Sequence, residues 1–201
     1  MTDALVVLGG YLLGSMPFGF WLVRLFKGAD IRTQGSGNIG ATNVWRVYGK
    51  TMGIPIVLLD VAKGFVPGLT GVLVTGDWLG VLAGAAAMLG HYRPLYLGFQ
   101  KGGKTVATAG GVAFAVAPLA AAACLAVWIL AFLGTRYASV ASIATALALP
   151  VACALTGESW PVIAFGAGAC AAVIFLHRVN IRRLRAGTES RFERRARSSL
   201  M

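Results

Sequence analysis

The chain has 201 residues, of which 57% are hydrophobic and 12% are charged, and its mean hydropathy is +0.74. A soluble domain carries charges on roughly a quarter of its residues, so this composition excludes that class and predicts an integral membrane protein. The formal net charge of +11 raises the alternative of nucleic-acid binding. Because the basic residues form short blocks between apolar stretches, the charge indicates membrane orientation, and we expect no nucleic-acid partner.

The first apolar stretch, residues 4–24, is interrupted by Gly14, Ser15 and Pro17 and is followed by further apolar stretches. These features argue against a cleaved signal peptide and favour a membrane-spanning helix.

A loop rich in glycine and small polar residues follows, with the sequence GSGNIGATN at residues 35–43. Its glycines allow successive N–H groups to converge, and its side chains add further donors. Together these groups predict a concave cradle for phosphate oxygens. The residues of this predicted cradle are Ser36, Gly37, Asn38, Gly40, Thr42 and Asn43.

The next apolar stretch, residues 52–74, contains two ionisable residues, Asp60 and Lys63. Such residues are costly in lipid unless they pair or face the interior of a bundle, and these two lie one helical turn apart. We expect a structural ion pair beneath the functional site. A role of Asp60 as a general base stays open.

After a further predicted span at 78–91, the sequence KGGK at 101–104 precedes an apolar helix expected over 105–117. The two glycines free the backbone, Lys104 supplies a positive charge, and the helix N-terminus offers unpaired N–H groups. These features predict a second phosphate site. The spacing does not match the nucleotide-binding loop GxxxxGK[ST], so hydrolysis of a nucleoside triphosphate is disfavoured.

Residues 105–135 must cross the membrane an even number of times, because the basic residues Lys104 and Arg136 place both ends on the cytoplasmic side. Pro118, near the middle, predicts two short helices joined at Ala117-Pro118. A full span needs ~20 apolar residues, so a re-entrant pair is the alternative to two crossings.

Two more spans are expected at 138–156 and 160–177. Near the start of the first, Ser139 and Ser142 lie one turn apart, and helix capping accounts for Ser139. After the second, His177 and Asn180 share a helical face, from which both can touch one anion. The arginines from 182 to 197 predict a basic anchor for anionic lipid headgroups.

Basic clusters at 24–50, 93–104, Arg136 and 178–197 mark the predicted cytoplasmic segments. We therefore predict an all-α integral membrane protein with seven transmembrane helices, some of them short, with the N-terminus outside and the C-terminus inside. The whole chain, 1–201, is expected to form one membrane-embedded domain, in which 178–201 is a basic cytoplasmic tail. On this topology every predicted phosphate-binding motif lies at the cytoplasmic boundary.

Taken together, these motifs resemble the bacterial acyl-phosphate:glycerol-3-phosphate acyltransferase family over nearly the whole chain. Thr105 departs from the pattern, because a third glycine is expected there. The motifs that carry the resemblance are GSMP at 14–17, DIR at 30–32 leading into GSGNIGATN, LDVAKG at 59–64, GH at 90–91 with Pro94, GGK with VAT at 106–108, and HRVNI at 177–181 with RL at 183–184.

The resemblance implies a seven-helix enzyme of the bacterial inner membrane with a cytoplasmic active site. It implies transfer of an acyl group from acyl phosphate to the sn-1 hydroxyl of glycerol 3-phosphate, the first step of phospholipid synthesis. It implies no metal and no other cofactor; membrane lipids are the expected surroundings, and we expect a monomer.

On this resemblance the GSGNIGATN cradle binds the acyl phosphate. The residues expected to act in catalysis are Ser36, Asn38, Lys104, His177 and Asn180. The residues expected to bind glycerol 3-phosphate are Arg46, Gly103, Lys104, Ser142, His177 and Asn180.

The sequence leaves the proton acceptor and one rival function open. No general base stands out, so a phosphate oxygen of a substrate is the alternative to His177 as acceptor of the hydroxyl proton. A transporter of a phosphorylated solute is the main rival, because charges within spans and glycine-broken helices also mark transport routes. A lipid phosphatase or alcohol phosphotransferase is disfavoured because the sequence has no DxxD pattern of paired acids for a metal.

Overall fold

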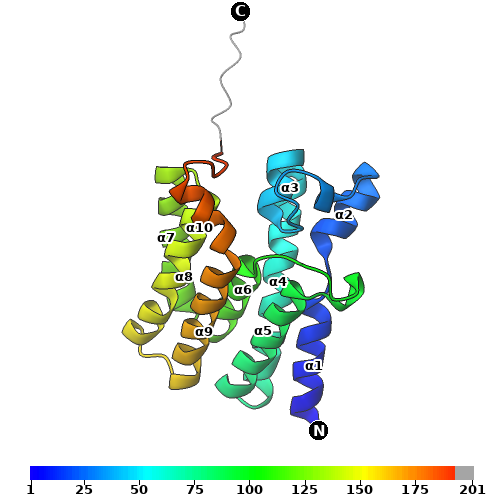
Figure 1. Cartoon of the computed structure of the whole chain (residues 1–201). Coiled ribbons are helices and arrows are strands. Elements are labelled where there is room, and N and C mark those ends of the chain that lie inside the picture. The colour runs from blue at the N-terminus through cyan, green and yellow to red at the C-terminus, as the bar shows by residue number, and fades with distance from the viewer. Residues whose placement is uncertain (193–201) are drawn as a thin grey trace, which may run out of the picture.

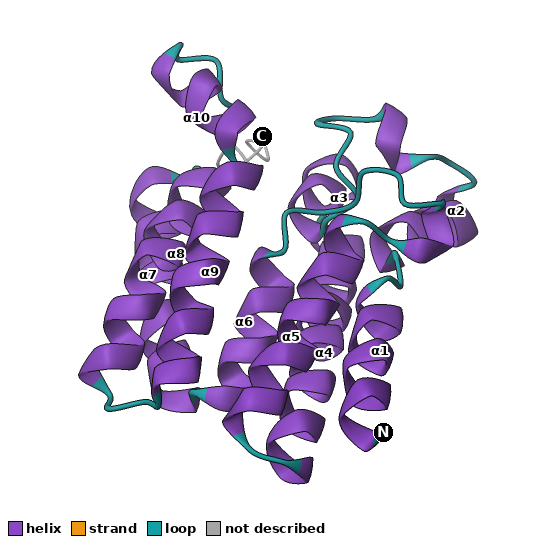
Figure 2. Cartoon of the chain, turned by 60° about the horizontal axis from the view of Figure 1, so that its bottom comes forward, coloured by secondary structure: helices purple, strands orange, loops and turns teal. Residues whose placement is uncertain are grey.

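The computed structural model describes residues 1–192, and the regular elements within this range are all helical. Seven helices form an upright bundle, whereas α2, α3 and α10 gather with the longer loops at one end (Figure 1, Figure 2). The bundle helices are α1 (Thr2–Gly14), α4 (Lys50–Val74), α5 (Asp77–Tyr92), α6 (Val106–Val116), α7 (Pro118–Thr135), α8 (Ala138–Leu155) and α9 (Trp160–Leu176). The end elements are α2 (Phe18–Lys27), the 3-10 turn η1 (Ile31–Thr33), α3 (Ala41–Tyr48), the 3-10 turn η2 (Leu95–Leu97) and α10 (Arg178–Arg185).

Within the described residues, four stretches are long and apolar enough to cross a membrane: Thr2–Lys27, α4, α7 and α8. Helices α9 and α10, bent by 57°, count as a fifth if the pair forms one span. Helices α5 and α6 have only 16 and 11 residues. The all-α prediction is confirmed for residues 1–192, and helices occur at every expected position. The number of crossings and the orientation of the termini stay predictions, and residues 193–201 of the predicted tail lie outside the described range.

The first predicted span is not one continuous helix, because it breaks between α1 and α2 at Ser15–Pro17. Proline has no N–H and disfavours helical backbone in the residue before it, which frees nearby carbonyl groups. One of these, the carbonyl of Met16, accepts a hydrogen bond of 2.9 Å from the ammonium of Lys63. The carbonyl group that this break leaves free is therefore paired with the buried Lys63 of α4.

Helices α4 and α6 approach each other backbone to backbone. A Cβ atom at Gly64 would collide with the carbonyl oxygen of Thr108, and one at Gly111 would collide with that of Val61. Small residues allow such contacts between membrane helices. This packing fixes the N-terminus of α6 beside the turn of α4 that carries Asp60 and Lys63.

The junction predicted at Ala117-Pro118 is confirmed, since α6 ends at Val116 and α7 begins at Pro118. Proline fits the first turn of a helix, where its missing N–H is not needed. At 18 residues, α7 is longer than the short helix predicted here, whereas α6 is short. The two helices therefore differ in their ability to span a bilayer.

Candidate active site

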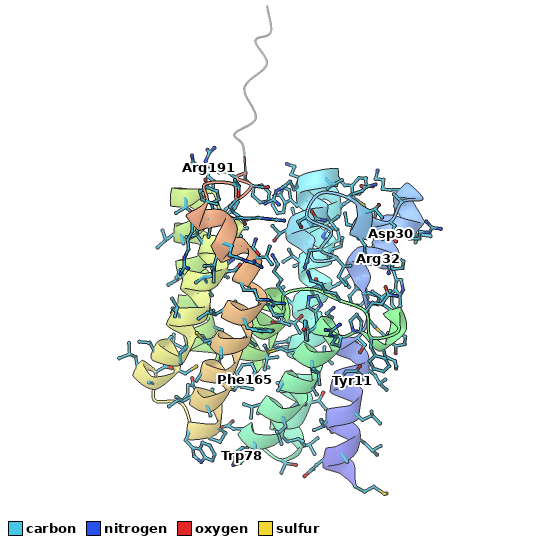
Figure 3. All side chains as sticks on the ribbon, in the orientation of Figure 1. Tyr11, Asp30, Arg32, Trp78, Phe165 and Arg191 are labelled. Carbon is cyan, nitrogen blue, oxygen red and sulfur yellow. The ribbon has the colours of Figure 1, made fainter. Side chains whose placement is uncertain are left out.

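A cavity of about 390 Å³ lies within the bundle, near the end at which α2, α3 and α10 gather. Figure 3 shows Arg191, which follows α10, at this end of the molecule and Trp78 at the opposite end. The cavity brings together most of the predicted ligands: Ser36, Asn38, Gly40, Thr42, Asn43, Arg46, Lys104, Ser142, His177 and Asn180. In the described part of the chain, Gly37 and Gly103 are not among its lining residues.

The predicted cradle, the loop before α3, is held from below by apolar side chains. Ile31, Ile39 and Val44 are each no more than 2% exposed and pack with Val23 and Ile56 in one cluster. Because these side chains anchor the loop, its polar groups are left on the side of the cavity.

One amide holds this loop from within. The N–H of Ser36 donates to Asn43 Oδ1 at 2.8 Å. Asn43 Nδ2 donates to the carbonyls of Gln34 and Asn38, each at 3.0 Å. The main chain of the loop therefore occupies both the oxygen and the nitrogen of the Asn43 side chain, which is only 2% exposed. In this structure Asn43 shapes the cradle, and its predicted direct contact with a ligand stays a prediction.

Ser36 and Asn38 offer the side-chain groups of the loop that face the cavity. Asn38 Oδ1 accepts from the N–H of Gly40 at 2.8 Å, which leaves its Nδ2 available as a donor. Ser36 is exposed, and its hydroxyl has no hydrogen-bond partner among the described residues. Gly37, with φ +69°, turns the chain between them and donates its N–H to the carbonyl of Gln34 at 2.9 Å.

The predicted second phosphate site, the turn before α6, is fixed by main-chain bonds to the end of α5. The N–H groups of Gly102 and Gly103 donate to the carbonyls of Tyr92 and His91 at 2.9 and 3.0 Å. A Cβ atom at Gly103 would collide with the ring of His91, so this position accepts only glycine. Gly103 therefore shapes the turn that presents Lys104.

Thr105, the departure from the family pattern, has a left-handed backbone with φ +61°. This conformation is uncommon for residues other than glycine and strained for a β-branched one. Its hydroxyl is buried and has no hydrogen-bond partner among the described residues. The backbone thus gives a physical reason for the glycine expected at this position.

Lys104 is joined to the segment around α10 by a chain of hydrogen bonds. Its Nζ donates to Asn180 Oδ1 at 2.6 Å, and Asn180 Nδ2 donates to Glu189 Oε1 at 2.7 Å. The same Glu189 oxygen accepts from Ser139 Oγ at 2.7 Å. The expectation that Ser139 caps its helix is wrong, because Tyr137 is the N-cap of α8 and the Ser139 hydroxyl reaches Glu189 instead.

Burial lowers the pKa of Lys104 to about 8, although the nearby carboxylate of Glu189 raises it in part. Lys104 therefore carries its charge at neutral pH but loses it about two and a half pH units lower than an exposed lysine would. A charged amine of this kind is suited to a phosphate group.

His177 lies between α9 and α10, and its Nδ1 is 2.8 Å from the carbonyl of Val173. The His177 side chain is buried, at 3% exposure, and the positive charge of Lys104 lies nearby, so its environment favours the neutral ring. A neutral ring with its proton on Nδ1 donates to Val173 and leaves a lone pair on Nε2. With this tautomer, Nε2 of His177 can accept a proton or a hydrogen bond.

Arg46 projects from α3 toward the segment after α10. Its guanidinium lies 4.9 Å from the ring centroid of Phe192 and donates weakly to the carbonyl of Ser190 at 3.4 Å. Burial lowers the pKa of Arg46, and its Nε has no partner among the described residues. The unpaired Nε is a buried donor on a side chain that lines the cavity.

Asp60 and Lys63 form the predicted ion pair, with 2.8 Å between Lys63 Nζ and Asp60 Oδ1, and their side chains are at most 3% exposed. His91 Nδ1 lies 3.7 Å from the same Asp60 oxygen. Asp60 and His91 both line the cavity, whereas Lys63 turns toward the carbonyl of Met16. The pair therefore borders the cavity and also ties α4 to the break between α1 and α2.

The cavity continues from the polar end into an apolar limb between α6, α7, α8 and α9. Trp128 marks the transition, since its Nε1 lies 3.4 Å from Ser142 Oγ. The apolar lining includes Phe114, Cys124, Leu125, Leu149, Ala169 and Cys170. The site thus combines groups for anions with a surface for a hydrocarbon chain.

Comparison with known proteins identifies the family of the chain. The family model described as glycerol-3-phosphate acyltransferase matches residues 4–187. The chain belongs to the glycerol-3-phosphate acyltransferase family.

Individual members of this acyltransferase family are similar to the chain over nearly its whole length. A glycerol-3-phosphate acyltransferase of Desulforudis audaxviator is 47% identical over 189 residues, which cover 94% of this chain and 95% of the relative. That of Aquifex aeolicus is 43% identical over 194 residues, covering 96% and 100%. Crystal structures of PlsY, an integral membrane glycerol 3-phosphate acyltransferase, in a glycerol 3-phosphate and a lysophosphatidic acid form are 42% identical, cover 96% of both chains, and give TM-scores of 0.92 and 0.90. This chain is thus an integral membrane acyltransferase.

Sequence analysis of this acyltransferase missed Glu189, whose carboxylate joins Asn180 to Ser139. An acid is not expected in an anion-binding site, and Glu189 lies among the arginines interpreted as a lipid anchor. His91 and Arg183 also line the cavity, although the sequence analysis assigns neither of them to the site. The position of Arg183 on the polar face of α10, one turn after Asn180, is a signal that could have identified it.

Proposed function

We propose that this acyltransferase takes its acyl group from acyl phosphate and transfers it to the sn-1 hydroxyl of glycerol 3-phosphate. The products are lysophosphatidic acid and inorganic phosphate, as in the first step of phospholipid synthesis. The observation that carries the proposal is a single cavity in which two clusters of donors meet an apolar limb. Two phosphate-bearing substrates, one with a long acyl chain, require this combination.

In this proposal the loop before α3 holds the phosphate of the acyl donor through its N–H groups, Ser36 and Asn38. The sequence also assigns Gly37, Gly40, Thr42 and Asn43 to this subsite. The acyl chain enters the apolar limb beyond Trp128. Glycerol 3-phosphate binds at the other cluster, formed by Arg46, Gly103, Lys104, Ser142, His177 and Asn180.

The reaction begins when the sn-1 oxygen attacks the carbonyl carbon of the mixed anhydride. The bond between that carbon and the phosphate oxygen then breaks, and the hydroxyl proton leaves with the phosphate as HPO₄²⁻. Because acyl phosphate is already activated, the protein contributes mainly position and charge neutralisation. A phosphate oxygen can accept the proton directly, and the free Nε2 of His177 is the alternative acceptor.

His177→Gln separates these two routes. Turnover that persists in His177→Gln, with a raised KM for glycerol 3-phosphate, supports proton transfer to the substrate phosphate. Complete loss of turnover with unchanged binding of glycerol 3-phosphate identifies His177 as the base.

The test of the function uses purified protein in lipid nanodiscs, with inorganic phosphate and lysophosphatidic acid both quantified. We expect phosphate release from acyl phosphate only when glycerol 3-phosphate is present, with one lysophosphatidic acid formed per phosphate. Phosphate release without the acceptor would indicate a hydrolase, and no release at all would favour a transporter of a phosphorylated solute.

Two variants test the assignment of the subsites. Ser36→Ala should raise the KM for acyl phosphate, and Lys104→Ala should raise the KM for glycerol 3-phosphate, because each removes a donor from one cluster. Thr33→Ala is the matched control, since Thr33 lies just before the same loop and its hydroxyl donates to the carbonyl of Asp30 outside the cavity. If Ser36→Ala instead raised the KM for glycerol 3-phosphate and Lys104→Ala that for acyl phosphate, the two subsites would have to be exchanged. Equal loss of folding and transfer in Ser36→Ala would show that the loop has a structural role.

We further propose seven crossings in the inner membrane, with the N-terminus outside, the active site facing the cytoplasm, and a monomeric protein forming one domain over 1–201. The basic tail, 178–201, contacts anionic lipid headgroups. Cysteines introduced as Asp77→Cys and Lys101→Cys, in a background without the three native cysteines, test the orientation. An impermeant thiol reagent should label the first in intact spheroplasts and the second only after lysis.

A further inference from the structure

Glu189 lies four residues after the end of α10 and connects three separate parts of the cavity. Its Oε1 accepts hydrogen bonds from Ser139 of α8 and Asn180 of α10, each at 2.7 Å. Asn180 in turn accepts from Lys104 of the turn before α6 at 2.6 Å. The carboxylate thus stands at the end of a chain that leads to the ammonium of Lys104.

These contacts determine the orientation of the Asn180 amide completely. Its oxygen faces an ammonium group, and its NH₂ faces a carboxylate. If the amide were turned by 180°, a donor would face the ammonium and an acceptor would face the carboxylate, so both bonds would be lost. Glu189 therefore fixes Asn180, and Asn180 fixes Lys104.

The segment that carries Glu189 is itself fastened to the bundle. The N–H of Phe192 donates to the carbonyl of Arg136 at 3.0 Å, and Arg191 Nε donates to that of Thr135 at 3.0 Å. The ring of Phe192 packs edge-on against those of Phe132 and Trp45, with centroid distances of 5.3 and 6.4 Å. The carboxylate is consequently held in place and is not a mobile surface group.

We propose that Glu189 is a positioning residue for acyl transfer, which fixes the Asn180 amide and thereby directs the Lys104 ammonium toward the phosphate of glycerol 3-phosphate. This inference rests on the proposed function, in which Lys104 and Asn180 bind that substrate. Glu189 acts through these two residues and takes no part in bond making or breaking.

The charge of Glu189 adds a second effect on Lys104. Glu189 counteracts the burial that lowers the pKa of Lys104 to about 8. Loss of the carboxylate charge should therefore lower this pKa further, because the other charges nearby are all positive. The titratable and charged groups that face Lys104 are Glu189, Lys101, Arg183, Arg46 and the neutral His177.

The central test is Glu189→Gln, which keeps the size and an acceptor oxygen but removes the charge. We measure kcat and the KM of each substrate from pH 6 to 9, together with Tm, in nanodiscs. The KM for glycerol 3-phosphate should rise by about tenfold or more, while the KM for acyl phosphate stays within about twofold. The pH at which the affinity for glycerol 3-phosphate falls should also move to a lower value.

Two further variants keep the proposal falsifiable. Glu158→Gln is the matched control. Glu158 lies outside the cavity, just beyond the C-terminal end of α8, whereas Ser139 lies at the start of this helix. The control should leave both KM values and the pH profile unchanged. Glu189→Asp shortens the side chain but keeps the charge, and it should retain the wild-type pH profile even if the KM rises.

The outcomes separate this inference from the proposed function. If Glu189→Gln lowers Tm but leaves the KM for glycerol 3-phosphate and its pH profile unchanged, Glu189 is a structural clamp and the inference is wrong. If the wild-type protein in the same preparation shows no transfer that depends on glycerol 3-phosphate, the proposed function itself fails.

Discussion

Replacement of Asn43 by alanine tests whether its buried amide builds the phosphate cradle or contacts the phosphate. Asn43→Ala removes three hydrogen bonds, of 2.8, 3.0 and 3.0 Å, to the main chain of the loop. At about 1 kcal/mol for each bond, the free energy of unfolding should fall by about 3 kcal/mol. This is a large part of the roughly 5–15 kcal/mol typical of a folded protein.

The assay combines thermal unfolding in nanodiscs with steady-state kinetics for both substrates. Asn43→Ala should lower Tm by several degrees and raise the KM for acyl phosphate, because the N–H groups of the loop no longer converge. Asn43→Asp keeps the acceptor for Ser36 but turns a buried carboxylate oxygen toward the carbonyls of Gln34 and Asn38, so its Tm should be no higher than that of Asn43→Ala. Thr33→Ala, which loses one bond outside the cavity, is the control. An unchanged Tm with abolished transfer in Asn43→Ala would refute a scaffold role and restore Asn43 as a direct ligand.

Three further predictions concern the turn before α6 and the packing beneath it. Thr105→Gly should raise the free energy of unfolding by about 1 kcal/mol in denaturation measurements, because it relieves a left-handed backbone and removes an unpaired buried hydroxyl; a decrease would show that this hydroxyl has a partner. The KM for glycerol 3-phosphate should rise above about pH 8, where Lys104 loses its proton, and a KM that stays constant to pH 9.5 would exclude this ionisation. Gly64→Ala should destabilise the protein by about 1–3 kcal/mol through its collision with Thr108, whereas Gly134→Ala, where a Cβ meets nothing within 4 Å, should not.

The sequence predicted those parts of the site whose chemistry is local. A loop with glycines and small polar residues carries its phosphate donors in its own backbone and side chains, so residues 35–43 can be predicted as a cradle without knowledge of their neighbours. Lys104 can be predicted as a phosphate ligand for the same reason, because it directly follows two glycines and precedes a helix N-terminus. Helix positions followed from apolar stretches that are long compared with the loops between them.

What the sequence could not predict depends on contacts between distant segments. Asn43 was assigned to the ligand because an amide in a phosphate-binding loop looks like a donor, yet here both its ends are used by the loop itself. Ser139 looked like a cap because nothing in the sequence brings Glu189 near α8. The break at Ser15–Pro17 was visible as an interruption, but its partner Lys63 lies far along the chain.

The charges around the cavity explain why an acid is tolerated in a site for anions. Arg46, Lys104 and Arg183 line the polar end together with Glu189, and three cations with one carboxylate leave a net charge of +2. Burial of the cations lowers the pKa values of Lys104 and Arg46, and a fixed carboxylate offsets part of this effect. Deeper in the cavity, Asp60 is balanced by Lys63 and adds no net charge. The remaining +2 suits the dianionic phosphate that we propose to bind here, and Glu189 partly restores the lowered pKa values of Lys104 and Arg46 while it holds Asn180 and, through it, Lys104 in place.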